Sequence, residues 1–198
     1  MSAWINMIPP EAADGALAEF YEMVQTPSGT VDNVMRVHSL RPHTMEGHVV
    51  LYRSVLHNPD NVLPFVFLEA VASYTSIVND CEYSLTHHFA NARRLMADEA
   101  RADAVFVALK AGRPEDVFEG KELALLRYAA KLTRDVGKMT KSDIEILHQA
   151  GCDDGEILEV NQVCAYFNYS NRLLNGLGVT TEGDVIGYYP EDSEPKGK

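Results

Sequence analysis

The sequence has few cysteines and no long apolar run. Its 198 residues include three cysteines, an odd number spread across the chain, which excludes a framework of paired disulfides and indicates reduced thiols. No segment reaches the roughly eighteen apolar residues that a membrane-spanning helix requires. Residues 1–15 lack a basic region followed by an apolar run, so we expect no signal peptide. These features predict a cytoplasmic protein without a membrane anchor.

Basic residues are scarce relative to acidic ones. The chain has 17 lysines and arginines against 29 aspartates and glutamates, which gives a formal net charge of −12. Because binding to nucleic acid or to an anionic membrane depends on positive charge, this balance argues against both as partners. The hydrophobic fraction of 46% is ordinary for a globular protein. The length fits one domain over residues 1–198.

The sequence also lacks the alternating pattern of β-strands. Apolar residues recur at helical spacing, and groups with proline or glycine separate the segments. Residues 184–198 are acidic and weakly apolar, which indicates a C-terminal tail, with at most one short extended piece near its start. The prediction is an all-α fold. We expect helices at residues 11–24, 31–40, 43–57, 62–78, 81–96, 98–111, 121–136, 140–150 and 154–175.

The residues that suggest chemistry gather around the break between the fourth and fifth expected helices. Asp80 is a good N-cap, so we expect Cys81 in the first turn of the fifth helix, where free N–H groups and the helix dipole favour a thiolate. Ser84 and His88 are four residues apart and therefore share a helix face. Glu69 lies in an otherwise apolar run, and a buried acid needs a partner.

The other histidine of this region and the other two cysteines have structural interpretations. We expect His87 to point away from His88, either solvated or at a subunit interface. Cys164 falls in the middle of the last helix and is expected to be buried. Cys152 follows a glycine that ends a helix, so we expect it to be exposed in a turn.

The spacing of these residues resembles a family signature. Glu69, then eleven residues, then CEYSLTHH starting at Cys81 resembles the E-x11-C-x-x-C-x3-H signature of the AhpD-like (alkylhydroperoxidase D / carboxymuconolactone decarboxylase) superfamily. The following helices are similar to its peroxidase-related branch, so the resemblance covers about residues 31–183. It implies an AhpD-like helical bundle that assembles as a homo-oligomer, a dimer or a higher state such as a trimer or hexamer.

One position departs from the signature. Ser84 stands where the family has its second cysteine, which in redox-active members is the reactive thiol near the histidine. The resemblance therefore carries over Glu69, Cys81 and His88 as site residues, with Tyr83 at a position that is histidine or tyrosine in the family. A second thiol that resolves an oxidised cysteine has to come from elsewhere in the chain, a neighbouring subunit or an external thiol.

Three functions are compatible with this site. The first is thiol-dependent reduction of alkyl hydroperoxides by a peroxidase-related antioxidant oxidoreductase, with Cys81 as the motif thiol and Glu69 and His88 as a proton relay. The second is a decarboxylase- or isomerase-like reaction on a small carboxylated molecule, and the third is a non-catalytic degenerate homologue. The expected partners are a small-molecule substrate and an unidentified thiol reductant. We expect no cofactor and no metal, since the C-x-x-C pair that zinc sites use is missing.

Overall fold

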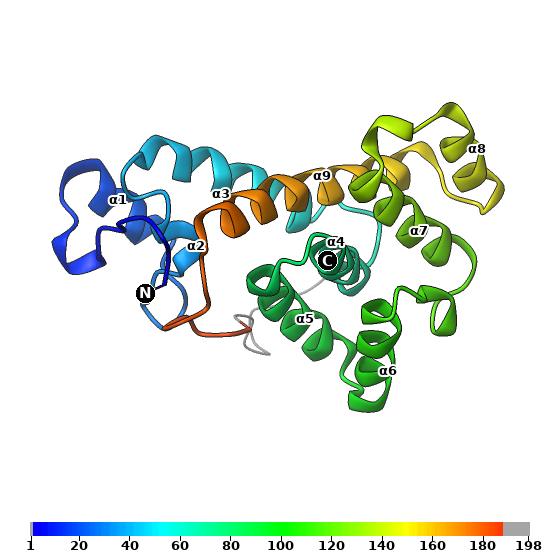
Figure 1. Cartoon of the computed structure of the whole chain (residues 1–198), viewed down its shortest axis with the longest axis horizontal. Helices are drawn as coiled ribbons and strands as arrows, with labels where there is room; N and C mark the ends of the chain where they lie inside the picture. The colour runs from blue at the N-terminus through cyan, green and yellow to red at the C-terminus, as the bar shows by residue number, and fades with distance from the viewer. Residues whose placement is uncertain (1, 188–198) are drawn as a thin grey trace.

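Helix α4 lies at the centre of the molecule, viewed nearly end-on in Figure 1, with α5, α7 and α9 packed around it. The computed structural model describes residues 2–187, and within that range all regular structure is helical. The all-α prediction is confirmed. The α-helices are α1 (Gly15–Met23), α2 (Asn33–Arg36), α3 (Pro42–Leu56), α4 (Phe65–Val78), α5 (Glu82–Met96), α6 (Glu99–Lys110), α7 (Gly120–Arg134), α8 (Lys141–Gln149) and α9 (Asp154–Leu177).

The predicted helices agree with these bounds, with two differences near the N-terminus. The expected helix at residues 11–24 is divided into a 3-10 turn at Pro10–Ala12 and α1, and only Asn33–Arg36 of residues 31–40 is α-helical. Two other 3-10 turns occur at Pro114–Asp116 and Val136–Lys138. Within the described residues, no helix is both long and apolar enough to cross a lipid bilayer.

The burial of α4 follows from its composition. Residues 67–76 are buried without interruption, because a helix that is apolar on all sides has to be covered on all sides. Its neighbours cover it: α5 and α7 are amphipathic, and the long helix α9 also packs against α4. Glu69 therefore lies in the most deeply buried part of the fold, fully shielded from solvent.

The break between α4 and α5 is a Schellman turn. Asp80 adopts a left-handed conformation with φ of 50°, and the N–H groups of Asp80 and Cys81 donate to the carbonyls of Ile77 (3.1 Å) and Ser76 (2.9 Å). Cys81 itself is the N-cap of α5, with no side-chain capping bond. The prediction of Asp80 as N-cap and of Cys81 in the first turn is therefore wrong, because Asp80 is used to end α4.

The first and last described segments of the chain lie side by side. The N–H of Trp4 donates to the carbonyl of Leu177 at 2.8 Å, and the N–H of Thr180 donates to the carbonyl of Ser2 at 3.0 Å. These bonds bring the segment after α9 back across the N-terminal residues. They place it next to α2 (Figure 1).

Asn33 fixes the segment after α9 from its other side. This side chain is fully buried, and its Nδ2 donates to the carbonyls of Thr180 and Glu182, both at 2.9 Å. Residues 180–187 are therefore held against the body of the protein, so the predicted tail does not begin at residue 184. The described part of the expected extended piece, residues 185–187, forms no strand. Residues 188–198 lie outside the described residues.

Candidate functional site

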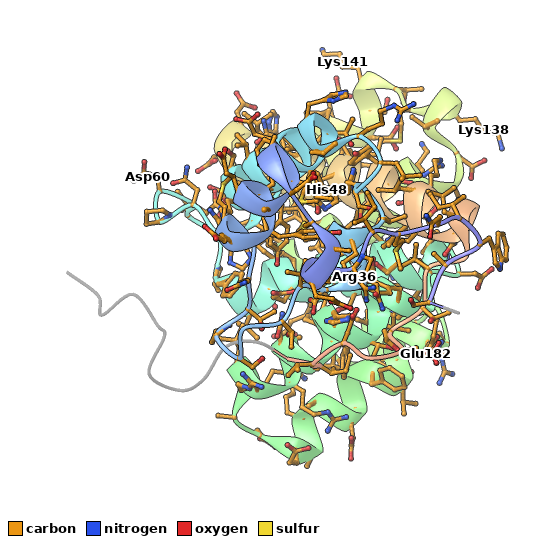
Figure 2. All side chains as sticks on the ribbon, turned by 90° about the vertical axis from the view of Figure 1, so that its left-hand side faces the viewer. Arg36, His48, Asp60, Lys138, Lys141 and Glu182 are labelled. Carbon is orange, nitrogen blue, oxygen red and sulfur yellow. The ribbon has the colours of Figure 1, made fainter. Side chains whose placement is uncertain are left out.

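A cavity of about 440 Å³ lies between α3, α5, α9 and the segment that joins α1 to α2. Figure 2 views the molecule from the side of α1 and α2 and labels His48 of α3 and Arg36 of α2. The volume suits a small molecule, and the wall is largely apolar. Its polar side chains include Asp32, His48, Tyr52, His57, Tyr83, Ser84, His87, His88, Asn91, Tyr166 and Ser170.

The structure brings Glu69 and His88 together at the edge of this cavity. Nδ1 of His88 lies 2.7 Å from Oε2 of Glu69, and Nδ2 of Asn91 donates to the other carboxylate oxygen at 3.3 Å. Glu69 is inaccessible to solvent, whereas His88 lines the cavity. Nδ1 of His88 can donate to this carboxylate, which leaves Nε2 as the ring nitrogen that can meet a ligand.

Ser84 and Cys81 have different access to the cavity. Ser84 lines it, one helical turn before His88, while Cys81 is fully buried in a small apolar cluster with Val37, Leu174 and other residues. Burial raises the pKa of the Cys81 thiol, and hydrogen bonds to Ser84 offset only part of that effect. The environment therefore favours a neutral thiol over the thiolate that the sequence predicts.

The other two cysteines are buried as well. Cys164 is fully shielded in α9, as predicted, and contacts the hydroxyl of Thr133 at 3.3 Å. Cys152 is only 5% exposed, so the prediction that it is exposed is wrong. Its N–H donates back to the carbonyl of Leu147 at 3.0 Å, and this turns the residue inward onto the core. Neither thiol lines the cavity.

A second polar group at the cavity involves Tyr83 and His87 of α5. The hydroxyl of Tyr83 donates to Oδ2 of Asp184 at 2.5 Å and accepts from the N–H of Val34 at 3.0 Å. The ring of His87 stacks on Tyr83 with centroids 4.8 Å apart, and its Nε2 lies 3.5 Å from Oδ2 of Asp184. His87 is 5% exposed and lines the cavity, so the expectation of a solvated His87 is wrong.

Asp32 lies beside this group and shares its buried environment. Burial, and to a smaller extent the neighbouring carboxylate of Asp184, raise the pKa of Asp32 from 3.8 to about 8. Sequence reasoning missed both aspartates. Asp184 was assigned to a tail, and no spacing in the sequence links it to Asp32.

Three histidines near the cavity are held neutral by burial. Burial lowers the pKa of His48 from 6.5 to about 3, with a further contribution from His38. Burial also lowers the pKa values of His38 and His57 to about 4. Nε2 of His48 is hydrogen-bonded to the hydroxyl of Tyr166 at 2.9 Å. These rings therefore act as uncharged, hydrogen-bonding parts of the wall at neutral pH.

Because His48 is neutral in the folded protein, we expect the protein to lose stability as the pH falls. We expect His48→Gln to reduce this loss. Below pH 6.5 the unfolded chain binds a proton at His48 that the folded chain rejects until about pH 3, so acid favours unfolding through this window by up to about 1.4 kcal/mol per pH unit. Glutamine can still hydrogen-bond Tyr166 but does not titrate. We expect the free energy of unfolding of the variant, measured in urea, to fall less than that of the parent between pH 6.5 and 4.

The comparison with the parent isolates His48. Asp32 titrates in both proteins with the opposite sign, because its raised pKa favours folding below pH 3.8 and loses that effect as the pH rises to about 8. An equal pH dependence in parent and variant contradicts the burial of a neutral His48.

Solved structures provide the likeness to known proteins; neither a family model nor a curated protein matches the sequence. An uncharacterized peroxidase-related protein from Ralstonia eutropha JMP134, described as an alkylhydroperoxidase AhpD core, is 21% identical, with a TM-score of 0.78 over 91% of this chain and 93% of that one. An uncharacterized peroxidase-related protein from Silicibacter sp. TM1040 is 22% identical, with a TM-score of 0.75 over 90% and 91%. The debrominase Bmp8 is 16% identical, with a TM-score of 0.66 over 85% of each chain. The chain therefore has the AhpD-like helical fold that the sequence resemblance predicted.

Proposed function

We propose that the protein is an enzyme in which His88, oriented by Glu69, transfers protons to or from a small, largely apolar substrate that carries a carboxylate. The observation that carries this proposal is the 2.7 Å bond between the two side chains at the edge of the cavity. A positioned imidazole is the commonest general acid or base, and such a group contributes roughly 10²- to 10⁴-fold to rate. The chemistry needs no second thiol, which agrees with Ser84 in the signature.

The cavity wall supports a substrate of this kind. Tyr52 and Tyr166 provide aromatic surface, neutral His57 provides a polar group without charge, and Ser84 provides a hydroxyl within one turn of His88. A small ring with one ionisable group matches this mixture of apolar and hydrogen-bonding surface. The debrominase Bmp8, which shares the fold, has been solved as a cysteine-to-alanine variant in complex with 2,3,4-tribromopyrrole. That structure is 14% identical to this chain, with a TM-score of 0.68 over 91% of this chain and 94% of that one.

Thiol-dependent reduction of hydroperoxides is the second candidate. It is supported by the sequence signature and by the peroxidase-related names of two solved structures with this fold. Cys81 is its only motif thiol, and this residue is shielded from solvent with a raised pKa. Peroxide chemistry therefore requires an opening that exposes Cys81, since a thiolate is the reactive form.

Cys81→Ala and thiol alkylation separate the two functions. We expect the parent protein to act on at least one member of a panel of small cyclic and aromatic carboxylic acids. We expect this activity to survive both iodoacetamide treatment and Cys81→Ala, and to disappear in His88→Gln. Cys152→Ala serves as the matched control for loss of a buried thiol. Turnover of alkyl hydroperoxides with a thiol reductant that disappears in Cys81→Ala, with no activity on the acids, overturns the proton-transfer proposal in favour of the second candidate.

A further inference from the structure

We infer that Asp32, His87 and Asp184 form a binding site for a divalent metal cation in the wall of the cavity. Each residue offers one ligand atom, and these three atoms all lie within 4.8 Å of one another. Nitrogen and oxygen ligands bind transition-metal cations at about 2.0–2.2 Å, so neighbouring ligand atoms in one coordination sphere are about 3–4 Å apart. Nε2 of His87 and Oδ2 of Asp184 are 3.5 Å apart. This site goes beyond the proposed proton transfer and departs from the sequence expectation of no metal.

The state of Asp32 independently points to a ligand. Asp32 is only 4% exposed. Its Oδ1 accepts no hydrogen bond from any residue in the described range. The side chain of Asp184 is 2% exposed. Among residues 2–187, no lysine or arginine forms an ion pair with either carboxylate. Buried carboxylates are ordinarily paired with a cation or bound to a metal, and a divalent ion neutralises both at once.

The surrounding contacts hold the ligands in place. The Tyr83 hydroxyl and the Asn33 N–H donate to the two oxygens of Asp184 at 2.5 Å and 3.0 Å. The Tyr83 ring also stacks on His87, so one side chain orients two ligands. Outer contacts of this kind fix the direction of metal ligands and typically contribute about 10- to 100-fold to metal affinity.

The ligand set indicates which cations fit. One imidazole and two carboxylates suit Zn²⁺, Mn²⁺ and Fe²⁺, which accept mixed nitrogen and oxygen ligands. Asp32 and His87 both line the cavity, so a cation can enter from that side and keep a coordination position for water or for an anionic group of a ligand. A bound cation then adds a positive charge to a wall in which His48 and His57 are neutral.

Binding of Mn²⁺ to the full chain, after chelator treatment and dialysis, tests the site. Mn²⁺ prefers oxygen and nitrogen ligands over thiolates, so the three cysteines do not compete for it. We expect calorimetry and electron paramagnetic resonance to show one saturable Mn²⁺ per chain, displaced by Zn²⁺. We expect Asp32→Asn and Asp184→Asn each to weaken binding by at least about tenfold, since each removes a charged ligand.

Two controls separate ligand loss from loss of structure. Asp154→Asn removes an exposed aspartate that pairs with His148 at 2.9 Å, and we expect it to leave Mn²⁺ affinity unchanged. Asp32→Asn keeps the shape of the buried side chain and removes its ionisable group, so its metal-free melting temperature should equal or exceed that of the parent. Absence of saturable Mn²⁺ and Zn²⁺ binding in the parent, or parent-like affinity in a folded Asp32→Asn variant, overturns the proposal and leaves two carboxyl groups that share a proton. Because binding is measured without turnover, either result is independent of the proposed enzyme activity.

Discussion

His88→Ala lowers kcat on the substrate identified in the panel by about 10²- to 10⁴-fold, the usual contribution of a general acid or base. His88 is the cavity-lining partner of the buried Glu69 carboxylate, held at 2.7 Å. Alanine removes the ring nitrogen that exchanges protons with the substrate and leaves Glu69 without its partner. Initial rates at saturating substrate measure the effect, with circular dichroism to establish that the variant is folded.

Glu69→Gln tests whether the carboxylate positions the imidazole. Glutamine keeps the shape of Glu69 but replaces the carboxylate beside Nδ1 of His88 with an amide. We expect a smaller loss in kcat than for His88→Ala and a shifted pH–rate profile, which a merely structural carboxylate does not cause. Cys81→Ala is the matched control in the adjoining turn and should retain parent-like kcat. A His88→Ala variant with parent-like kcat contradicts the proton-transfer role.

Phe167→Ala lowers the free energy of unfolding by about 3–5 kcal/mol, the usual cost of emptying a buried aromatic site. Phe167 is 1% exposed in α9, and its ring meets His88 edge-on at 4.6 Å and Tyr166 at 5.1 Å. The substitution therefore leaves a void in the core directly against the imidazole of the site. Urea denaturation measures the change, and each kcal/mol corresponds to roughly 2–4 °C in melting temperature for a chain of this size.

Leu158→Ala provides the control for Phe167→Ala on the same helix. Leu158 is 55% exposed, so its truncation removes little buried surface and should change the free energy of unfolding by at most about 0.5 kcal/mol. If both variants lose equal stability, the burial of Phe167 in the core does not account for the effect of Phe167→Ala. We expect a less ordered His88 ring only in Phe167→Ala, because only this substitution removes an aromatic contact to His88.

The part of the site that depends on helical spacing was predictable from sequence. Glu69 and His88 belong to adjacent helices joined by a short turn, and the apolar run around Glu69 required a partner nearby. Their pairing therefore follows from local order. The N-cap of α5 did not follow, because Asp80 can either cap α5 or end α4. The backbone of Asp80 adopts the left-handed conformation that ends α4.

The part that depends on distant segments was not predictable. Asp184 looked like the start of an acidic tail because composition cannot reveal the buried Asn33 that holds residues 180–187. Cys152 looked exposed because a turn after glycine is usually at the surface, whereas here the turn folds onto the core. In each case a tertiary contact overrides a local pattern that is correct on average.

The order in which the two halves of the site form follows from their separation along the chain. Glu69 and His88 are 19 residues apart, within one pair of helices, so their contact closes a short loop. Asn33 and Asp184 are 151 residues apart, and joining such distant segments costs more chain entropy and is slower. We therefore expect the contact between Glu69 and His88 to form before the contact between Asn33 and Asp184. Until the segment after α9 docks, Asp32 and His87 at the cavity lack their neighbour Asp184.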